Sequence, residues 1–118
     1  MPTSEREAFA PFDVVVVPFP YSDRLAEKRR PALVISGAKL AAYGLVWVAM
    51  ITSAENKRWP ADVAIVDLKR AGLPAPSVVR PAKIACIESG RIIQRAGKLD
   101  KKAAQAVIAE LRGFLEVV

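Results

Sequence analysis

The sequence predicts a mainly β protein of the α+β class, in which a small, strongly bent sheet or barrel precedes one C-terminal amphipathic helix. Three observations carry this prediction. Short β-branched and apolar segments recur before Asp100, turn-rich connections separate them, and the apolar period changes to helical spacing after that residue. A chain of 118 residues has the length of one domain, so we expect a single domain over residues 1–118.

The first half of the chain contains three segments that are rich in β-branched or apolar residues, which is typical of strands. Pro18 and Pro20 lack backbone donors, which places the first strand at an edge or bulge there. Residues 21–30 form a polar connection without glycine that we interpret as a moving flap, and residues 37–44 hold one helical turn. The predicted strands are 13–19, 31–36 and 45–53, of which the third is expected to be central.

The second half continues the pattern and then changes period. A break is expected at Pro81, and Ser89 with Gly90 predicts a hairpin turn. Asp100 is a suitable N-cap for the final helix, whose apolar face we expect to pack on the sheet. The predicted strands are 61–68, 78–88 and 91–99. The predicted apolar helix face consists of Ala104, Val107, Ile108, Leu111 and Leu115.

Histidine is absent from the chain, and only one cysteine is present. The first fact removes the usual general base at neutral pH, and the second excludes an intramolecular disulfide and a cysteine-rich zinc site. The carboxylates are scattered, with no DxD or ExxE pair at a useful spacing. We therefore expect a metal-independent protein that needs no cofactor and works in a reducing compartment.

The chain carries 18 Lys and Arg against 12 Asp and Glu, which gives a net charge of +6. A small basic domain favours polyanionic partners, with nucleic acid first and an acidic protein second. The N-terminal stretch MPTSEREAF lacks the apolar segment of a signal peptide, and no apolar run approaches the ~20 residues of a membrane span. We expect a cytoplasmic protein that does not contact a membrane.

Three cations, Lys28, Arg29 and Arg30, run directly into a proline and an apolar strand. Arg30 is either a solvated or salt-bridged side chain, or a permanently charged planar fork that recognises a phosphate. A residue before proline is steered into extended backbone, and Arg80, also followed by proline, repeats the arrangement. Both arginines are therefore expected to be held stiffly where a loop becomes a strand.

Thr52 ends the third predicted strand, and Ser53 follows it. Threonine suits strands in any case. Its hydroxyl is therefore either structural or placed beside Arg30, where it would bond a phosphate oxygen or a reacting hydroxyl.

Two tryptophans differ in their surroundings. Trp59 follows Lys57 and Arg58, and an aromatic ring beside cations can stack a base while the charges hold the backbone. The same ring can equally cover the core. Trp47 alternates with apolar residues on one strand face, which indicates the core or a dimer surface, and Cys86 is expected to be a small buried hydrophobe.

Four segments, FDVVVVPFPYSD, RRPALVIS, VAMITS and PSVVRPAKIACI, span most of residues 12–99. Their order and spacing resemble the PemK/MazF-like family, the toxins of type II toxin–antitoxin systems. RPALV after an apolar strand is the most specific of these segments. Phe12 stands where the family usually has a glycine, a departure that concerns a turn.

The resemblance implies an SH3-like barrel with a C-terminal helix, acting as a homodimer. It implies a metal-independent, sequence-specific endoribonuclease that cleaves single-stranded RNA such as mRNA and inhibits growth. A cognate antitoxin protein would cover the RNA groove. By motif, Arg30 and Thr52 are the expected catalytic residues, and the family's acidic loop residue has two candidates for an acid/base role, Asp23 and Glu27.

In such a reaction the 2′-hydroxyl attacks the phosphorus, and Arg30 would stabilise the charge that develops on the non-bridging oxygens. Thr52 would position a phosphate oxygen or the nucleophile, while the base stays unassigned between a loop carboxylate and water. Two other functions stay open: a catalytically inactive SH3-like module that binds RNA or an antitoxin, and a gyrase-targeting toxin of the same fold. The expected RNA-binding residues are Lys28, Arg29, Ser53, Lys57, Arg58, Trp59 and Arg80.

Overall fold

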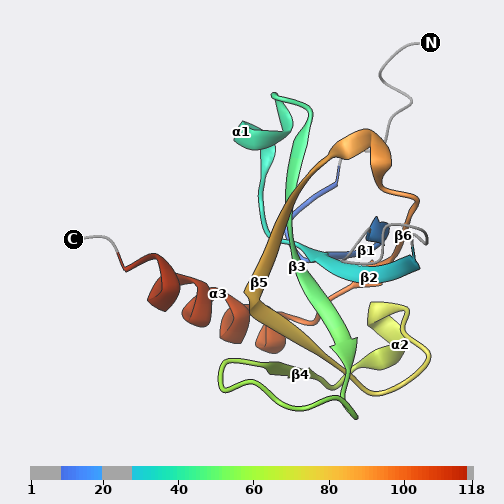
Figure 1. Ribbon diagram of the computed structural model, residues 1–118, viewed down its shortest axis with the longest axis vertical. Coiled ribbons are helices and arrows are strands. Elements are labelled where there is room, and N and C mark those ends of the chain that lie inside the picture. Colours follow the sequence, from blue (N-terminus) through green and yellow to red (C-terminus); the bar gives the residue numbers. More distant parts are fainter. Residues whose placement is uncertain (1–8, 20–27, 117–118) are drawn as a thin grey trace.

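The computed structural model describes residues 9–19 and 28–116. In this part six strands form one antiparallel sheet in the order β4-β5-β3-β2-β1-β6, with β3 inside it as predicted. Figure 1 shows the sheet strongly curled, with the long strands β3 and β5 side by side, and the mainly β, barrel-like fold is confirmed. The strands are β1 (Asp13–Phe19), β2 (Lys28–Val34), β3 (Leu45–Ser53), β4 (Val63–Ile65), β5 (Ser77–Glu88) and β6 (Gln94–Lys98).

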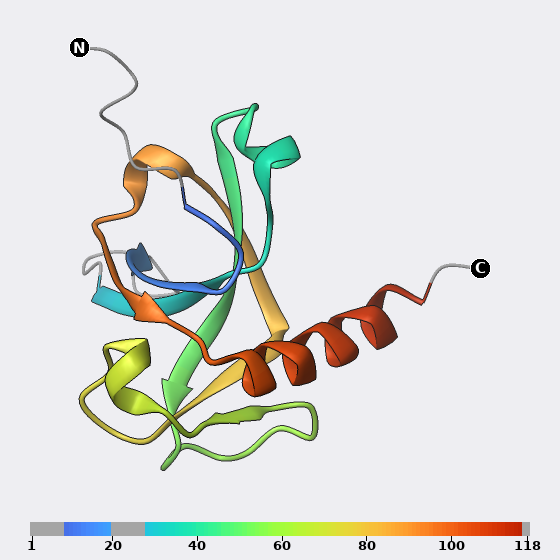
Figure 2. The same ribbon diagram turned by 180° about the vertical axis from the view of Figure 1, so that it is seen from behind.

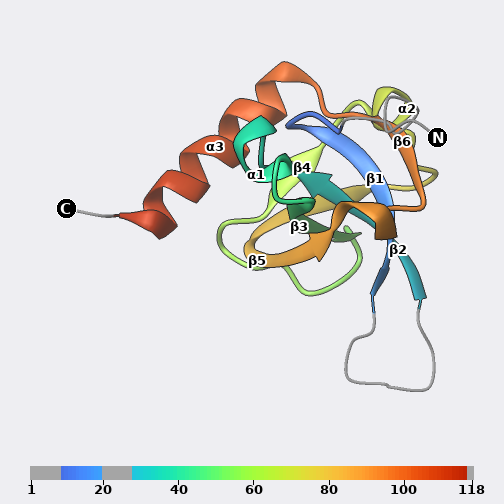
Figure 3. The same ribbon diagram turned by 90° about the horizontal axis from the view of Figure 1, so that it is seen from above.

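The strands are joined by short helical turns and followed by one long helix. Asp100 caps that helix as predicted, since its carboxylate accepts a hydrogen bond of 3.1 Å from the backbone N–H of Ala103. Figure 3 shows α3 along one side of the curled sheet. The helices are α1 (Ala38–Ala41), α2 (Leu68–Ala71), the 3₁₀ turn η2 (Ser89–Arg91) and α3 (Lys101–Leu115).

Only the first half of the predicted apolar face of α3 is buried. Ala104 and Val107 belong to the core with Ala103, and Leu111 packs at its border. Seen from behind, the helix continues past the sheet (Figure 2). The expected burial of Leu115 is therefore wrong: it is 70% exposed, because no strand reaches that far along the helix.

β1 is buried on both faces, as its β-branched run predicts. Val14 packs into a core cluster with α3, whereas Val15 and Val17 point into a second cluster on the opposite face. β1 is not an edge strand over its whole length, since it pairs with β6 as far as Val16 and with β2 from Val14 to Phe19. Pro18 lies beyond the β6 pairing, where a missing backbone donor breaks no ladder on that side.

Asp13, at the start of β1, joins this strand to β6. Its side chain is 2% exposed and accepts hydrogen bonds from Arg95 Nε at 3.0 Å, Lys98 Nζ at 2.9 Å and the backbone N–H of Ala10 at 2.9 Å. Burial raises the pKa of Asp13, but these hydrogen bonds and the charge of Arg95 lower it more, so the pKa lies below the usual 3.8.

Three connections differ from the prediction. The connection expected over 21–30 is wrong at its end, because Lys28, Arg29 and Arg30 already pair with β1 as the start of β2. The hairpin expected at Ser89 and Gly90 is wrong, because η2 turns the chain and β6 then pairs with β1 instead of β5. The strand expected over 61–68 is shorter, because the carboxylate of Asp67 accepts from Arg70 N–H and begins α2. Consequently the second half of this segment leaves the sheet.

β5 does not break at Pro81 but bulges there. Ala49 of β3 lies opposite Ile84, and the next residue, Met50, lies opposite Arg80. Residues 81–83 therefore have no opposite residue on β3, and the strand bends at this point. The bulge gives the sheet part of its curl.

Two residues of the β3–β5 pair are more exposed than expected. Trp47 lies opposite Cys86 and is 47% exposed, and Cys86 is exposed too. The expectation of a buried Cys86 is therefore wrong, as is the core interpretation of Trp47. Both lie on the face that α3 covers further along, but beyond the reach of the core cluster. The dimer-surface interpretation of Trp47 stays a prediction.

Candidate functional site

A small pocket lies where β2, β3 and β5 run side by side. Its volume is about 160 Å³, and none of the described residues that line it is acidic. Three basic side chains in so small a space favour an anion such as a phosphate. The lining residues are Arg30, Met50, Ile51, Thr52, Arg80 and Lys83.

The antiparallel register explains why distant parts of the sequence meet in this pocket. Ala32 of β2 lies opposite Met50 of β3. Arg30 lies two residues before Ala32, and Thr52 lies two residues after Met50. Since the strands are antiparallel and side chains alternate between faces, Arg30 and Thr52 point to the same face at neighbouring positions. Met50 also lies opposite Arg80 of β5. The two Arg–Pro dipeptides of the sequence therefore converge on one pocket. Both arginines lie inside their strands, so the predicted position where a loop becomes a strand is wrong for Arg30 as well as for Arg80.

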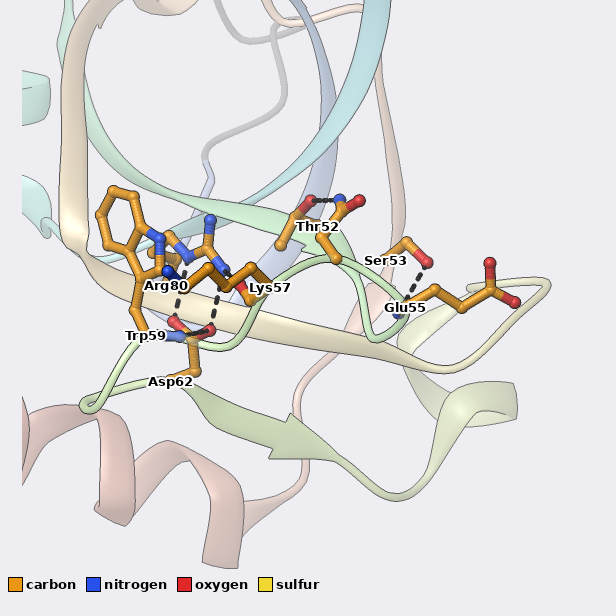
Figure 4. Close-up of polar contacts among 8 residues, drawn as sticks. Thr52, Ser53, Glu55, Lys57, Trp59, Asp62 and Arg80 are labelled. Atoms are coloured by element: carbon orange, nitrogen blue, oxygen red, sulfur yellow. Dashed lines mark hydrogen bonds and ion pairs between the residues drawn. The ribbon is translucent and has the colours of Figure 1, made fainter.

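Thr52 is held at the point where β3 gives way to a loop. Its Oγ1 accepts a hydrogen bond of 2.6 Å from Asn56 Nδ2, and the next hydroxyl, Ser53 Oγ, accepts one of 3.1 Å from the backbone N–H of Glu55 (Figure 4). These bonds close a turn directly after the strand. The Thr52 hydroxyl is thereby fixed beside the pocket and keeps a lone pair and its proton for a ligand.

Arg80 joins the pocket to the loop between β3 and β4, residues 54–62. Its Nε and Nη2 donate to Asp62 Oδ1 and Oδ2 at 3.0 and 2.9 Å, and Nη2 also donates to the carbonyl of Lys57 at 2.8 Å (Figure 4). The side chains of Arg80 and Asp62 are 11% and 1% exposed. This bidentate ion pair is therefore buried. Arg80 was predicted to contact RNA, and the structure gives it a second possible role, which is to hold the β3–β4 loop through Asp62.

The carboxylate of Asp62 is held in its charged form. Burial raises its pKa, but hydrogen bonds from Arg80 and from the backbone N–H of Trp59, with the charges of Arg80 and Arg58, lower it more. The pKa of Asp62 therefore lies below the usual 3.8, and the ion pair persists at neutral pH.

Trp59 covers the guanidinium of Arg80 instead of entering the core clusters. The Arg80 guanidinium carbon lies 4.1 Å from the ring centroid, which is a cation–π contact. The ring stays 38% exposed, so part of its surface faces solvent. The ring thus covers the Arg80 ion pair on one side and still exposes part of its surface to a ligand.

A family model described as "PemK-like, MazF-like toxin of type II toxin-antitoxin system" matches residues 10–115. The chain belongs to this family. A search of curated proteins finds no significant match for this member of the family.

Solved structures of MazF proteins share the fold of this PemK/MazF-like toxin. The MazE–MazF complex of Deinococcus radiodurans (Form-III) superimposes with a TM-score of 0.75 at 20% identity, covering 95% of this chain and 100% of the other. Toxin MazF-mt6 of Mycobacterium tuberculosis gives 0.70 at 20%, covering 90% and 98%. An endoribonuclease bound to its cognate antitoxin, from a mycobacterial species, gives 0.73 at 15%, covering 94% and 98%.

The predicted site residues of this toxin fall into three groups. Arg30, Thr52 and Arg80 line the pocket. Asp23 and Glu27, the candidates for the acid/base role, lie outside the described residues, as does most of the predicted flap. The remaining predicted RNA contacts are exposed. Lys28 and Arg29 precede Arg30 on β2, Ser53 ends β3 next to Thr52, and the β3–β4 loop carries Lys57, Arg58 and Trp59.

Two side chains that matter to the site are absent from the sequence-based prediction. Lys83 lines the pocket because the bulge after Arg80 turns it there. Asp62 has no motif around it and reads as an ordinary acid at the start of a strand. In the sequence, the proline after Arg80 indicates an irregularity of the strand. It does not indicate that the resulting bulge turns Lys83 toward the pocket.

No helix in the described residues is long and apolar enough to span a membrane.

Proposed function

We propose that this toxin is an endoribonuclease that cuts single-stranded RNA at specific sequences, without a metal ion, by attack of the 2′-hydroxyl on the adjacent phosphate. The observation that carries the proposal is the basic pocket in which Arg30 and Thr52, the residues of the two family motifs, are neighbours. Their separation in sequence makes this meeting a property of the fold. One structural relative, from a mycobacterial species, is itself an endoribonuclease.

Arg30 binds the scissile phosphate in this mechanism. As the 2′-oxygen forms its bond to phosphorus and loses its proton, negative charge grows on the two non-bridging oxygens, and the guanidinium neutralises it. The bond from phosphorus to the 5′-oxygen then breaks, and that oxygen takes up a proton. The products are a 2′,3′-cyclic phosphate and a 5′-hydroxyl.

The hydroxyl of Thr52 donates its proton to a phosphate oxygen while Asn56 holds it in place. The base that removes the 2′-proton is either Asp23, Glu27 or a water molecule. A guanidinium keeps its proton in proteins and cannot serve as this base. Such a site lacks the matched acid–base pair of fast nucleases and favours slow, selective cleavage.

The strand around the cut would lie across the exposed cations beside the pocket. Lys28 and Arg29 precede Arg30 on β2. Beyond Thr52, the exposed candidates are Ser53 at the end of β3 and Lys57, Arg58 and Trp59 on the β3–β4 loop. Cations on phosphates give affinity and salt dependence, whereas a partly exposed aromatic ring gives contact with a base.

A homodimer and an antitoxin complete the proposal. Trp47 and Ile84, 47% and 46% exposed, lie on one apolar face of the β3–β5 pair with Cys86. Such a face suits a two-fold contact with a second copy. The antitoxin would be an acidic protein that competes with RNA for the basic surface. We place the toxin, its RNA substrate and its antitoxin in the cytoplasm.

The test uses purified protein, end-labelled single-stranded RNA of mixed sequence and EDTA. We expect discrete fragments that end in 2′,3′-cyclic phosphate. The control is Arg30→Ala, which we expect to abolish cutting without lowering the unfolding midpoint. RNA that is retarded on a gel but uncut would indicate a catalytically inactive module that binds RNA. In a separate gyrase assay, inhibition of gyrase by a protein that cuts no RNA would indicate a gyrase-targeting toxin. A fully active Arg30→Ala variant would refute the assignment of Arg30.

A further inference from the structure

The β3–β4 loop, residues 54–62, carries three consecutive candidate RNA contacts, Lys57, Arg58 and Trp59, and residues 53–60 are exposed. An exposed loop of this length is costly to hold in one conformation, because each residue loses backbone freedom. Its first part is held by Thr52 through Asn56, and by a backbone bond of 3.0 Å from Ala54 N–H to the carbonyl of Pro76.

Arg80 holds the second part of the loop. One side chain makes two hydrogen bonds to Asp62, one to the Lys57 carbonyl and a stacking contact with Trp59. Asp62 in turn accepts from the backbone N–H of Trp59 at 2.9 Å, so the loop closes on itself round the guanidinium. Only a planar fork with several donors can make these contacts together.

Arg80 also lines the pocket with Arg30 and Thr52. The side chain that orders the loop is therefore part of the wall that surrounds the proposed scissile phosphate. The second part of the loop is therefore linked to the pocket through one residue on a paired strand, opposite Met50.

We propose that Arg80 is the positioning residue for RNA specificity in this toxin. Its ion pair with Asp62 holds Lys57, Arg58 and Trp59 at a fixed distance from the cleavage pocket. These three residues therefore contact only the bases that lie at that distance from the scissile phosphate, which selects the sequence that is cut. Cations on the strands would contact phosphate, which carries no sequence information, whereas the loop presents the partly exposed ring of Trp59 to a base. This inference rests on the proposed ribonuclease activity.

The test compares three variants on a pool of RNA with randomised sequence, in EDTA, with cut sites read by sequencing. Arg80→Met and Asp62→Asn break the same ion pair from opposite sides. We expect both to widen the set of sequences cut and to raise KM for the preferred RNA about tenfold, with a smaller change in kcat. Arg80→Lys keeps the positive charge but lacks the planar guanidinium with its several donors. We therefore expect its set of cut sequences to be nearly as wide as that of Arg80→Met. Asp62→Asn keeps one acceptor for the loop and is the variant to use if Arg80→Met does not fold.

Lys83→Met is the matched control, because it removes a positive charge from the same pocket and the same strand. We expect it to weaken binding evenly across sequences and to reduce the salt dependence, without widening the set of sites. If Lys83→Met widens the set as much as Arg80→Met does, general loss of charge explains the effect and the positioning role is wrong.

Limited digestion with trypsin separates failure of this inference from failure of the proposed function. Trypsin cuts after Lys57 and Arg58, and we expect Arg80→Met and Asp62→Asn to be cut there at least about tenfold faster than the parent protein, because protection tracks local opening. Equal digestion rates, or unchanged specificity and KM, overturn the positioning role. A parent protein that cuts no RNA overturns the proposed function and the specificity role with it, and the digestion rates then decide whether Arg80 orders the loop.

Discussion

Replacing Asp13 by Asn keeps the shape of the side chain and removes its charge. In the parent protein this buried carboxylate accepts from Arg95, Lys98 and the backbone of Ala10. Lys98 donates to Oδ1 of Asp13, whereas Arg95 and Ala10 donate to Oδ2. An amide keeps only one acceptor oxygen, so its NH₂ group would face either the Lys98 ammonium or the N–H groups of Arg95 and Ala10. β1 and β6 would therefore meet at a mismatched buried contact.

The expected cost follows from exposure. A hydrogen bond to a charged group contributes about 1.5–3 kcal/mol, but the side chains of Arg95 and Lys98 are 36% and 48% exposed and regain water when released. We therefore count about 0.5–1 kcal/mol for each ion pair and about 1–2 kcal/mol for the buried mismatch. The sum is about 2–4 kcal/mol, or roughly 8–16 °C in the unfolding midpoint at about 4 °C per kcal/mol.

Urea and thermal unfolding at pH 7 measure this cost, at equal protein concentrations because a dimer would make the midpoint depend on concentration. Lys98→Met is the matched control: it removes one exposed partner of Asp13 and should cost less than about 1 kcal/mol. A loss below about 0.5 kcal/mol in Asp13→Asn would refute the role of Asp13 as the link between β1 and β6.

Three further outcomes are expected. The contribution of Asp13 and Asp62 to the free energy of unfolding should be constant above about pH 5 and fall as the pH drops further, because their folded pKa values lie below the usual 3.8. This stabilisation is fully present above the unfolded pKa and is lost as the pH falls through the folded pKa, so Asp13→Asn should lose stability less steeply in an acid titration. Thr52→Val should lower kcat for RNA cleavage about tenfold to a hundredfold, and Thr52→Ser by less than about threefold; equal rates in both would exclude the hydroxyl. Trp47→Lys should convert a dimer to a monomer in sedimentation, whereas Val66→Lys, at a more exposed apolar residue, should not.

The elements that local pattern determines were predicted well from the sequence. β3 begins and ends at the predicted residues, and α3 starts at its predicted cap, Asp100. The neighbourhood of Arg30 and Thr52 was also expected, because two motifs with family roles imply a shared site. The pairing of β2 with β3 explains it physically.

What the sequence did not reveal depends on contacts between distant segments. Ser89 and Gly90 have the composition of a hairpin, but β6 gains more by pairing with β1, where Asp13 meets Arg95 and Lys98. Cys86 alternates like a core residue, yet α3 does not reach it.

Phe12 illustrates a rule that the fold overrides. Its φ of 75° lies in the left-handed region that favours glycine, which is the residue the family resemblance led us to expect there. The conformation is held by bonds from Phe12 N–H to Val34 O at 2.7 Å and from Leu99 N–H to Phe12 O at 2.9 Å, and the ring packs against the core. Tertiary contacts thus offset a local cost.

The most direct measurement uses two synthetic RNAs that differ in one atom. Once the cut site has been mapped, the nucleotide on the 5′ side of the scissile phosphate is replaced by its 2′-deoxy form, and single-turnover rates are compared in EDTA. We predict that the all-ribose RNA is cut and the deoxy-substituted RNA is bound with similar affinity but left intact. Cleavage of both at equal rates would show that the 2′-hydroxyl is not the nucleophile, and Arg30 and Thr52 would then need another role.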